Sequence, residues 1–192
     1  MSRPGEPTVV IVPGLRDHIA EHWQTVLAHT LAVADRDVRT VLPPTQGRLG
    51  RAAQVEALNQ VVAQVEGPVV LVAHSAGVIT AVHWAHQHGA GVVGALLATP
   101  PDFDSPLPAG YPAPRELAEN GWTPVPRKPL PFPSIVAASS NDPLCGFAQV
   151  AELARDWGSR LVELGEVGHL NPASGHGPWP QAAELLAELE RD

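Results

Sequence analysis

Short apolar runs alternate along the chain with longer amphipathic stretches, and this alternation constrains the fold more than any other feature of the sequence. Each run is rich in Val, Leu or Ala. Continuous apolar runs of this kind are typical of parallel strands buried on both faces, and parallel strands need crossover connections, usually helices. The pattern therefore predicts an α/β fold. The predicted strands cover residues 8–12, 38–42, 69–73, 92–98, 135–139 and 161–164.

The stretches between the apolar runs have the periodicity of helices. The clearest covers residues 51–65, where Val55, Leu58, Val62 and Val65 recur at helical spacing and would form one buried stripe. Four further stretches give a weaker signal of the same kind. They predict helices over residues 22–33, 76–88, 147–157 and 181–189.

One long connection departs from this alternation, because 11 of the 21 prolines lie within residues 100–133. Proline has a fixed φ and no backbone N–H, so this density excludes long helices and central strands. We expect an ordered loop that wraps the domain, anchored by aromatic residues such as Tyr111 and Trp122. The length of the chain predicts a single domain over residues 1–192, with residues 1–7 flexible.

The composition argues against several classes of function. Twelve basic against 20 acidic residues give a formal net charge of -8, which repels a phosphate backbone, so no nucleic-acid partner is expected. Cys145 is the single cysteine, which excludes a disulfide framework and a four-cysteine zinc site. No signal segment follows Met1 and no run of about 18 apolar residues occurs, so we expect a cytoplasmic protein with no membrane span. Lys128 stands alone against 11 arginines, which favours GC-rich coding DNA and a bacterial source.

The segment Ala73-His74-Ser75-Ala76-Gly77 follows an apolar strand and precedes a predicted helix. A serine at such a strand-to-helix turn is in the position of a nucleophile elbow, where small neighbours let a strained backbone pass and the hydroxyl projects from the sheet. An ordinary strand-to-helix turn made of small residues would have the same sequence pattern. Ser75 is the candidate nucleophile.

A nucleophilic hydroxyl needs a base, and the base needs an orienting acid. Asp142 lies just past the end of the fifth predicted strand, and His169 lies in a glycine-flanked turn after the sixth. Alone, Asp142 is equally typical of a turn before proline, and His169 of a surface histidine. The order Ser, Asp, His, each beyond a strand, indicates one site at the carboxyl edge of the sheet. Asp102 and Asp104, one strand earlier, are alternative acids.

The loop after the first strand supplies a candidate oxyanion site. Gly14 permits close backbone approach, and the backbone N–H of Leu15, with that of Ala76, would bind a developing oxyanion. A plain strand-to-helix loop is the simpler interpretation of the same residues. Tyr111 or Trp122 would bound the pocket. Its expected lining includes Gly14, His18, His74 and Trp122.

Histidines also cluster at helical spacing, which raises a zinc alternative. His18 and His22 form one pair, and His83, His86 and His88 form a second group. Zinc sites of this spacing need a third ligand, and the chain has no His-Glu-x-x-His segment. Solvated helix faces are the preferred interpretation, with His18 or His22 free to line the pocket without binding a metal.

Several short motifs occur together in one known family. They are His22-Trp23-Gln24, Ser139-Ser140-Asn141-Asp142-Pro143, Gly168-His169-Leu170-Asn171 and Ser174-Gly175-His176-Gly177-Pro178-Trp179-Pro180. With them the chain resembles, over residues 9–189, the retinoblastoma-binding protein 9 family of small serine hydrolases, whose bacterial members are often called YdeN-like. Ala73 departs from the glycine usual in the family's elbow. Leu144 directly precedes Cys145, so the Leu-x-Cys-x-Glu motif is absent and retinoblastoma binding is not expected.

The resemblance implies a minimal α/β-hydrolase fold. Its sheet would have about six mostly parallel strands in the order 2-1-3-4-5-6, with helices on both faces and no cap domain. The triad would fall on Ser75, Asp142 and His169. We expect hydrolysis of small esters or amides through an acyl-enzyme, without cofactor or metal. The alternative is a non-catalytic binding protein with a vestigial triad.

Overall fold

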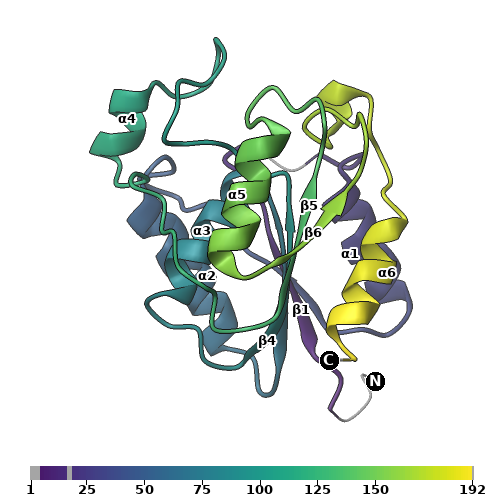
Figure 1. The fold of residues 1–192 in the computed structure, drawn as a ribbon. Helices are drawn as coiled ribbons and strands as arrows, with labels where there is room; N and C mark the ends of the chain where they lie inside the picture. The colour runs from purple at the N-terminus through teal and green to yellow at the C-terminus, as the bar shows by residue number, and fades with distance from the viewer. Residues whose placement is uncertain (1–4, 17–18, 192) are drawn as a thin grey trace.

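A six-stranded sheet runs through the centre of the computed structural model, which describes residues 5–16 and 19–191 (Figure 1). The strand order is β2-β1-β3-β4-β5-β6 and every neighbouring pair is parallel, which confirms the predicted sheet. The strands are β1 (Thr8–Val12), β2 (Val38–Thr40), β3 (Val69–His74), β4 (Val92–Ala98), β5 (Ser134–Ala138) and β6 (Arg160–Glu163).

Helices cover both faces of the sheet. Helices α2, α3 and α5 pack on one face, and α1 and α6 pack on the other (Figure 1). A short helix, α4, lies in the proline-rich connection, and a 3-10 turn, η1, follows β6. The bounds are α1 (Trp23–Val33), α2 (Arg51–Ala63), α3 (Ala76–Ala85), α4 (Pro114–Glu119), α5 (Phe147–Trp157), η1 (Pro172–Ser174) and α6 (Gln181–Leu189).

Two hydrophobic cores lie on the two faces of the sheet. Successive side chains of a strand point to opposite faces, so Val10 and Val12 pack under α2 and α3, whereas Val9 and Ile11 pack in the core under α1 and α6. All four are at most 1% exposed. Burial on both faces is the physical reason that these strands are continuously apolar in the sequence.

Some element ends differ from the sequence-based expectation. The strand predicted to reach residue 42 ends at Thr40, because β2 is an edge strand and Leu42 is 73% exposed. The helix predicted over residues 76–88 ends at Ala85. Gly89 follows with a positive φ of 63°, which the backbone of a continuing helix cannot adopt.

The proline-rich segment contains the short helix α4, which was not predicted. Pro114 occupies the first turn of that helix, where a missing N–H costs nothing, and Leu117 is buried beneath it. Trp122 anchors the segment by donating its indole N–H to the carbonyl oxygen of Leu49 at 2.5 Å. Prolines therefore exclude a long helix here, as expected, but one of them begins a short helix.

The parallel arrangement brings the carboxyl ends of β1, β3, β5 and β6 to one edge of the sheet, where the loops that follow them meet. Within residues 5–16 and 19–191, no helix is both long enough and apolar enough to cross a membrane.

Candidate active site

Ser75 occupies a sharp turn between β3 and α3, with φ 56° and ψ −130°. A positive φ strains a residue with a side chain, and contacts on both sides hold the turn in place. The Ser75 N–H donates to the carbonyl oxygen of Ala98 at 3.0 Å. A Cβ atom at Gly77 would lie 2.2 Å from the carbonyl oxygen of Val12, so only glycine fits there. Ala73 is fully buried in β3, where its methyl group is accommodated.

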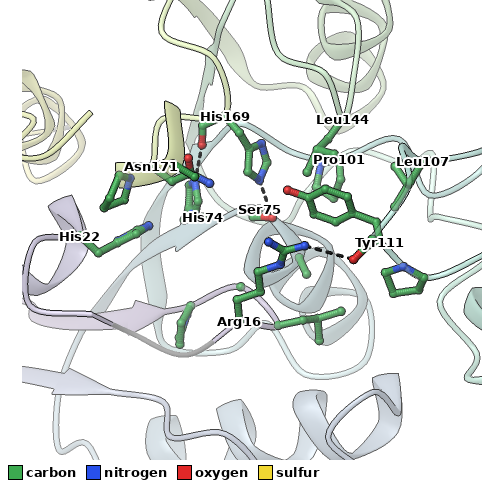
Figure 2. A pocket seen from close by; sticks show the side chains of 18 of the residues that line it. Arg16, His22, His74, Ser75, Pro101, Leu107, Tyr111, Leu144, His169 and Asn171 are labelled. Atoms are coloured by element: carbon green, nitrogen blue, oxygen red, sulfur yellow. Dashed lines mark hydrogen bonds between the residues drawn. The ribbon is translucent and has the colours of Figure 1, made fainter. Parts of the chain in front are cut away.

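The hydroxyl of Ser75 lies at one end of a line of hydrogen bonds. Ser75 Oγ is 2.8 Å from His169 Nε2 (Figure 2), and His169 Nδ1 is 2.8 Å from Asp142 Oδ2. A carboxylate only accepts hydrogen bonds, so His169 Nδ1 carries the proton and Nε2 of the neutral ring accepts from the serine. The side chains of His169 and Asp142 are 5% and 1% exposed, and burial strengthens both bonds.

Further hydrogen bonds fix the acid and the base. Asp142 Oδ1 accepts from the backbone N–H of Leu144 at 2.9 Å, which orients the carboxylate. The backbone N–H of His169 donates to Ser174 Oγ at 2.9 Å. His74 Nε2 lies 2.9 Å from the His169 carbonyl oxygen, and since a carbonyl only accepts, this nitrogen is the donor (Figure 2). The strand that carries the nucleophile thus also holds the loop that carries the base.

The carboxylates of the two alternative acids, Asp102 and Asp104, form hydrogen bonds and an ion pair with other residues. Asp102 Oδ1 accepts from the backbone N–H of Asp104 at 3.1 Å. Asp104 accepts from the backbone N–H of Val125 at 3.4 Å and lies 3.9 Å from the guanidinium of Arg127. Both carboxylates contact residues of the proline-rich segment, whereas the ring of His169 is hydrogen-bonded to Asp142.

The second histidine group does not converge. His83 is buried and donates from Nε2 to the carbonyl oxygen of Trp122 at 3.1 Å, and its burial lowers its pKa below 6.5. His86 and His88 follow the end of α3 and are exposed. His83 therefore lies in the core and not on the solvated helix face that was expected, whereas His86 and His88 are solvent-exposed as expected.

Of the first histidine group, the structure describes only His22. His22 caps α1, its Nδ1 accepting from the backbone N–H of Gln24 at 3.2 Å. His18 lies outside the described residues. Among the residues that are described, no three His, Cys, Asp or Glu side chains are grouped closely enough to hold a metal ion.

A cavity of about 350 Å³ opens over the Ser75 hydroxyl and the His169 ring (Figure 2). Its walls come from the β1–α1 loop, the proline-rich segment, the loop after β5 and the loop after β6. Most of the lining is apolar, as in ligand pockets generally. The predicted residues that line it are Gly14, Leu15, His22, His74, Ser75, Ala76, Tyr111 and His169.

Trp122 was predicted to line the pocket, and the structure corrects this. Its side chain is fully buried, packed edge-to-face on Phe103 with ring centroids 5.4 Å apart, and its indole N–H is bound to Leu49. Phe103 and Leu49 both line the cavity, so Trp122 supports the wall from behind. Sequence periodicity gives no direction for a side chain in an irregular segment. The sequence therefore could not distinguish a Trp122 that lines the cavity from one that packs in the core behind the cavity wall.

Sequence reasoning also missed polar residues of the lining. Arg16 and Asn171 both line the cavity. Arg16 directly follows Leu15, and Asn171 is the second residue after His169, so their proximity to the site was the available signal. Which way each side chain turns depends on tertiary contacts.

The sequence also matches the model of a known protein family. The model of the serine hydrolase family matches residues 9–188, which is most of the chain. The chain belongs to the serine hydrolase family. No curated protein matches its sequence.

Solved structures resemble this serine hydrolase along almost its whole length. A YdeN-like hydrolase from Pectobacterium atrosepticum is 29% identical, with a TM-score of 0.78 over 97% of this chain and 91% of that one. The ydeN gene product of B. subtilis is 19% identical, with a TM-score of 0.72 over 97% of this chain and 100% of that one. Est1E from Butyrivibrio proteoclasticus, at 12% identity, has a TM-score of 0.65 over 96% of this chain and 86% of that one. The two less similar proteins share the fold, and the described residues form a small α/β-hydrolase fold without a cap domain.

Proposed function

We propose that this serine hydrolase cleaves small esters or amides through a catalytic triad of Ser75, His169 and Asp142. The unbroken line of hydrogen bonds from Ser75 Oγ through the His169 ring to Asp142, at 2.8 Å for each bond, carries the proposal. A serine hydroxyl becomes nucleophilic when a base within hydrogen-bond distance takes its proton and a third group orients that base.

Acylation follows from this arrangement. As Ser75 Oγ attacks the carbonyl carbon of the substrate, His169 Nε2 accepts the hydroxyl proton. Asp142 stabilises the imidazolium that forms and keeps the Nδ1 proton in place. His169 then gives its Nε2 proton to the leaving alcohol or amine, the bond to that group breaks, and the acyl group remains on Ser75.

The oxyanion of the tetrahedral intermediate is assigned to the backbone N–H groups of Ala76 and Leu15. Ala76 is the first residue of α3, so its N–H has no acceptor within the helix and lies at the positive end of the helix dipole. Gly14 brings the second donor close, since a Cβ atom there would be 3.3 Å from the Ser75 Cβ. Each donor of such a pair contributes about 3 kcal/mol to transition-state stabilisation.

Deacylation uses the same groups in reverse. A water molecule gives a proton to His169 Nε2 and attacks the acyl carbon. The bond from that carbon to Ser75 Oγ then breaks as His169 returns the proton to Oγ, which releases the acid and restores Ser75. The cavity volume of about 350 Å³ is near the lower end of ligand pockets, which span about 300–1,000 Å³, so small acyl groups are favoured. We expect faster turnover of short-chain than of long-chain esters.

Labelling with a fluorophosphonate probe tests the triad without knowledge of the substrate. The probe phosphonylates only an activated serine, so the native protein should be labelled, and Ser75→Ala and His169→Ala should each lose the label. Tandem mass spectrometry of the labelled protein should place the adduct on Ser75.

Two matched controls separate loss of chemistry from loss of folding. Ser105→Ala and His29→Ala remove the same side chains at exposed positions and should label like the native protein. A well-folded native protein that takes no label would overturn the triad and favour the alternative, a non-catalytic binding protein with the hydrolase fold.

We also place the chain in the retinoblastoma-binding protein 9 and YdeN-like group within the serine hydrolases. The motifs around His22, Asp142 and His169 support this grouping, together with the similarity to the Pectobacterium hydrolase.

A further inference from the structure

The charge inside the candidate active-site cavity differs from the charge of the whole molecule. The chain has a formal net charge of -8, yet the lining contains no Asp or Glu among the described residues. It does contain Arg16, whose side chain ends in a cationic guanidinium group. A mostly apolar cavity whose lining holds a guanidinium cation and no carboxylate among the described residues favours an anionic ligand.

Arg16 is held in place by the proline-rich segment. Its Nη2 donates to the carbonyl oxygen of Gly110 at 3.2 Å, and its guanidinium carbon lies 4.3 Å from the centroid of the Tyr111 ring (Figure 2). Stacking on an aromatic ring fixes the guanidinium plane without using its N–H groups.

The guanidinium retains donors for a ligand. It has five N–H donors, and the bond to Gly110 uses one of them. No carboxylate among the described residues lies within ion-pair distance of Arg16, whereas other arginines such as Arg36 and Arg127 are paired. A carboxylate accepts two parallel N–H bonds from an arginine, which is the strongest arrangement available to it.

Arg16 is also close enough to the nucleophile to act on a small substrate. It is the second residue after Gly14, and Gly14 packs against Ser75. Two Cα–Cα steps span at most about 7.6 Å. The side chain then extends into the cavity, and in the view of Figure 2 the Ser75 hydroxyl lies between His169 and the Arg16 guanidinium.

We propose that Arg16 binds a carboxylate group of the substrate, so that the preferred substrates are small esters or amides bearing a carboxylate near the scissile bond. This inference rests on the proposed triad and names the substrate class for it. Because the whole molecule repels anions, the local cation supplies both attraction and orientation.

A purely structural role for Arg16 makes a different prediction. The bond to Gly110 and the contact with Tyr111 tie the β1–α1 loop to the proline-rich segment. If that were its whole contribution, replacing Arg16 would change the hydrolysis of charged and neutral substrates by the same factor.

Two pairs of isosteric esters measure the difference. Para-acetoxybenzoate and para-acetoxybenzamide differ by a charge on the leaving group. The mono-para-nitrophenyl ester of adipic acid and its primary-amide analogue differ by a charge on the acyl group. For each pair, the ratio of kcat/KM for the anionic ester to that for the neutral one is determined in the native enzyme, Arg16→Gln, Arg16→Lys and Arg115→Gln. Arg115→Gln is the matched control, because its side chain is 89% exposed on α4 and removes the same charge.

In at least one pair we expect a native ratio of about tenfold or more, the size of one charged hydrogen bond. The ratio should fall to near one in Arg16→Gln, stay above one in Arg16→Lys, and remain native in Arg115→Gln. Added salt should lower the native ratio as it screens the pair.

Fluorophosphonate labelling of the same preparations separates the two levels of the proposal. A labelled native enzyme with a ratio near one in both pairs, or an Arg16→Gln variant that keeps the native ratio, overturns the role of Arg16 and leaves the triad intact. A folded native protein that takes no label and cleaves none of the esters overturns the triad, and this inference with it.

Discussion

Ser75 adopts a backbone conformation that costs a non-glycine residue about 1–3 kcal/mol. The cost is offset by the hydrogen bond to Ala98 and by the burial of every residue of α3 behind the turn. The same turn directs the hydroxyl to within 2.8 Å of His169. At the scale of residues, the candidate site therefore depends on strain that the surrounding fold maintains.

Asp142→Asn tests the role of the acid with almost no change in volume. An amide in place of the carboxylate can still accept from the N–H of Leu144, which leaves its NH₂ group facing His169 Nδ1. The ring must then carry its proton on Nε2, where it cannot accept the proton of Ser75. We expect kcat for para-nitrophenyl acetate to fall about ten-thousandfold with the fold intact.

The control for this change is Asp102→Asn, which alters one of the two alternative acids in the same way. Asp102 interacts with the backbone of Asp104, so its loss should leave kcat within about twofold of native. If Asp102→Asn lost more activity than Asp142→Asn, the acid would have been assigned to the wrong strand end.

At the scale of elements, the sequence predicts the bounds of helices and strands whose burial shows in their apolar pattern. It does not predict bounds that depend on contacts between elements. β1 and β4 have the predicted bounds because they are apolar along most of their length and buried on both faces, and α5 and α6 have them because their buried residues recur at helical spacing. The end of β2 depends on its place at the edge of the sheet. The helix α4 was obscured by the prolines around it, although Pro114 is compatible with a first helical turn.

For the candidate site, the sequence likewise predicted the residues whose position follows from buried strands. Ser75, Asp142 and His169 each follow a buried strand, and a parallel sheet brings strand ends of one kind to one edge. The lining was less predictable. Trp122 turned out to be core and Arg16 turned out to face the cavity, because the direction of a loop side chain is set by neighbours that are distant in sequence, such as Leu49 and Gly110.

Gly77→Ala tests the contact between α3 and β1 on which the elbow depends. The added methyl group would lie 2.2 Å from the carbonyl oxygen of Val12, and backbone atoms cannot rotate away as a side chain can. We expect the free energy of unfolding in urea to fall by about 1–3 kcal/mol, together with slower fluorophosphonate labelling. Gly177→Ala is the control, with its nearest atom at an ordinary 3.7 Å, and should behave like the native enzyme. Equal stability of the two variants would contradict a steric requirement for glycine in the elbow.

At the scale of the molecule, polar contacts join the proline-rich segment to the helices on one face of the sheet, and His83 provides one of them. It lies in α3, within the core formed by α2, α3 and α5, and donates to the carbonyl oxygen of Trp122 in the proline-rich segment. Its burial lowers its pKa, and the charge of nearby Arg51 lowers it further. The folded molecule therefore resists protonation at this position.

This resistance predicts how the stability of the whole molecule depends on pH. Well above about pH 6.5, His83 is neutral in both the folded and the unfolded states, and it adds no pH dependence. As the pH falls through that value, the unfolded chain gains a proton that the folded state binds less readily, so the free energy of unfolding decreases. His83→Gln keeps an N–H that can donate to Trp122 but cannot be protonated, so its urea midpoint should decrease less than the native one between about pH 7.5 and about pH 5.5. His29→Gln, which replaces an exposed histidine of α1, should follow the native protein. If His83→Gln lost as much stability as the native protein over this range, the acid sensitivity would have to come from other groups.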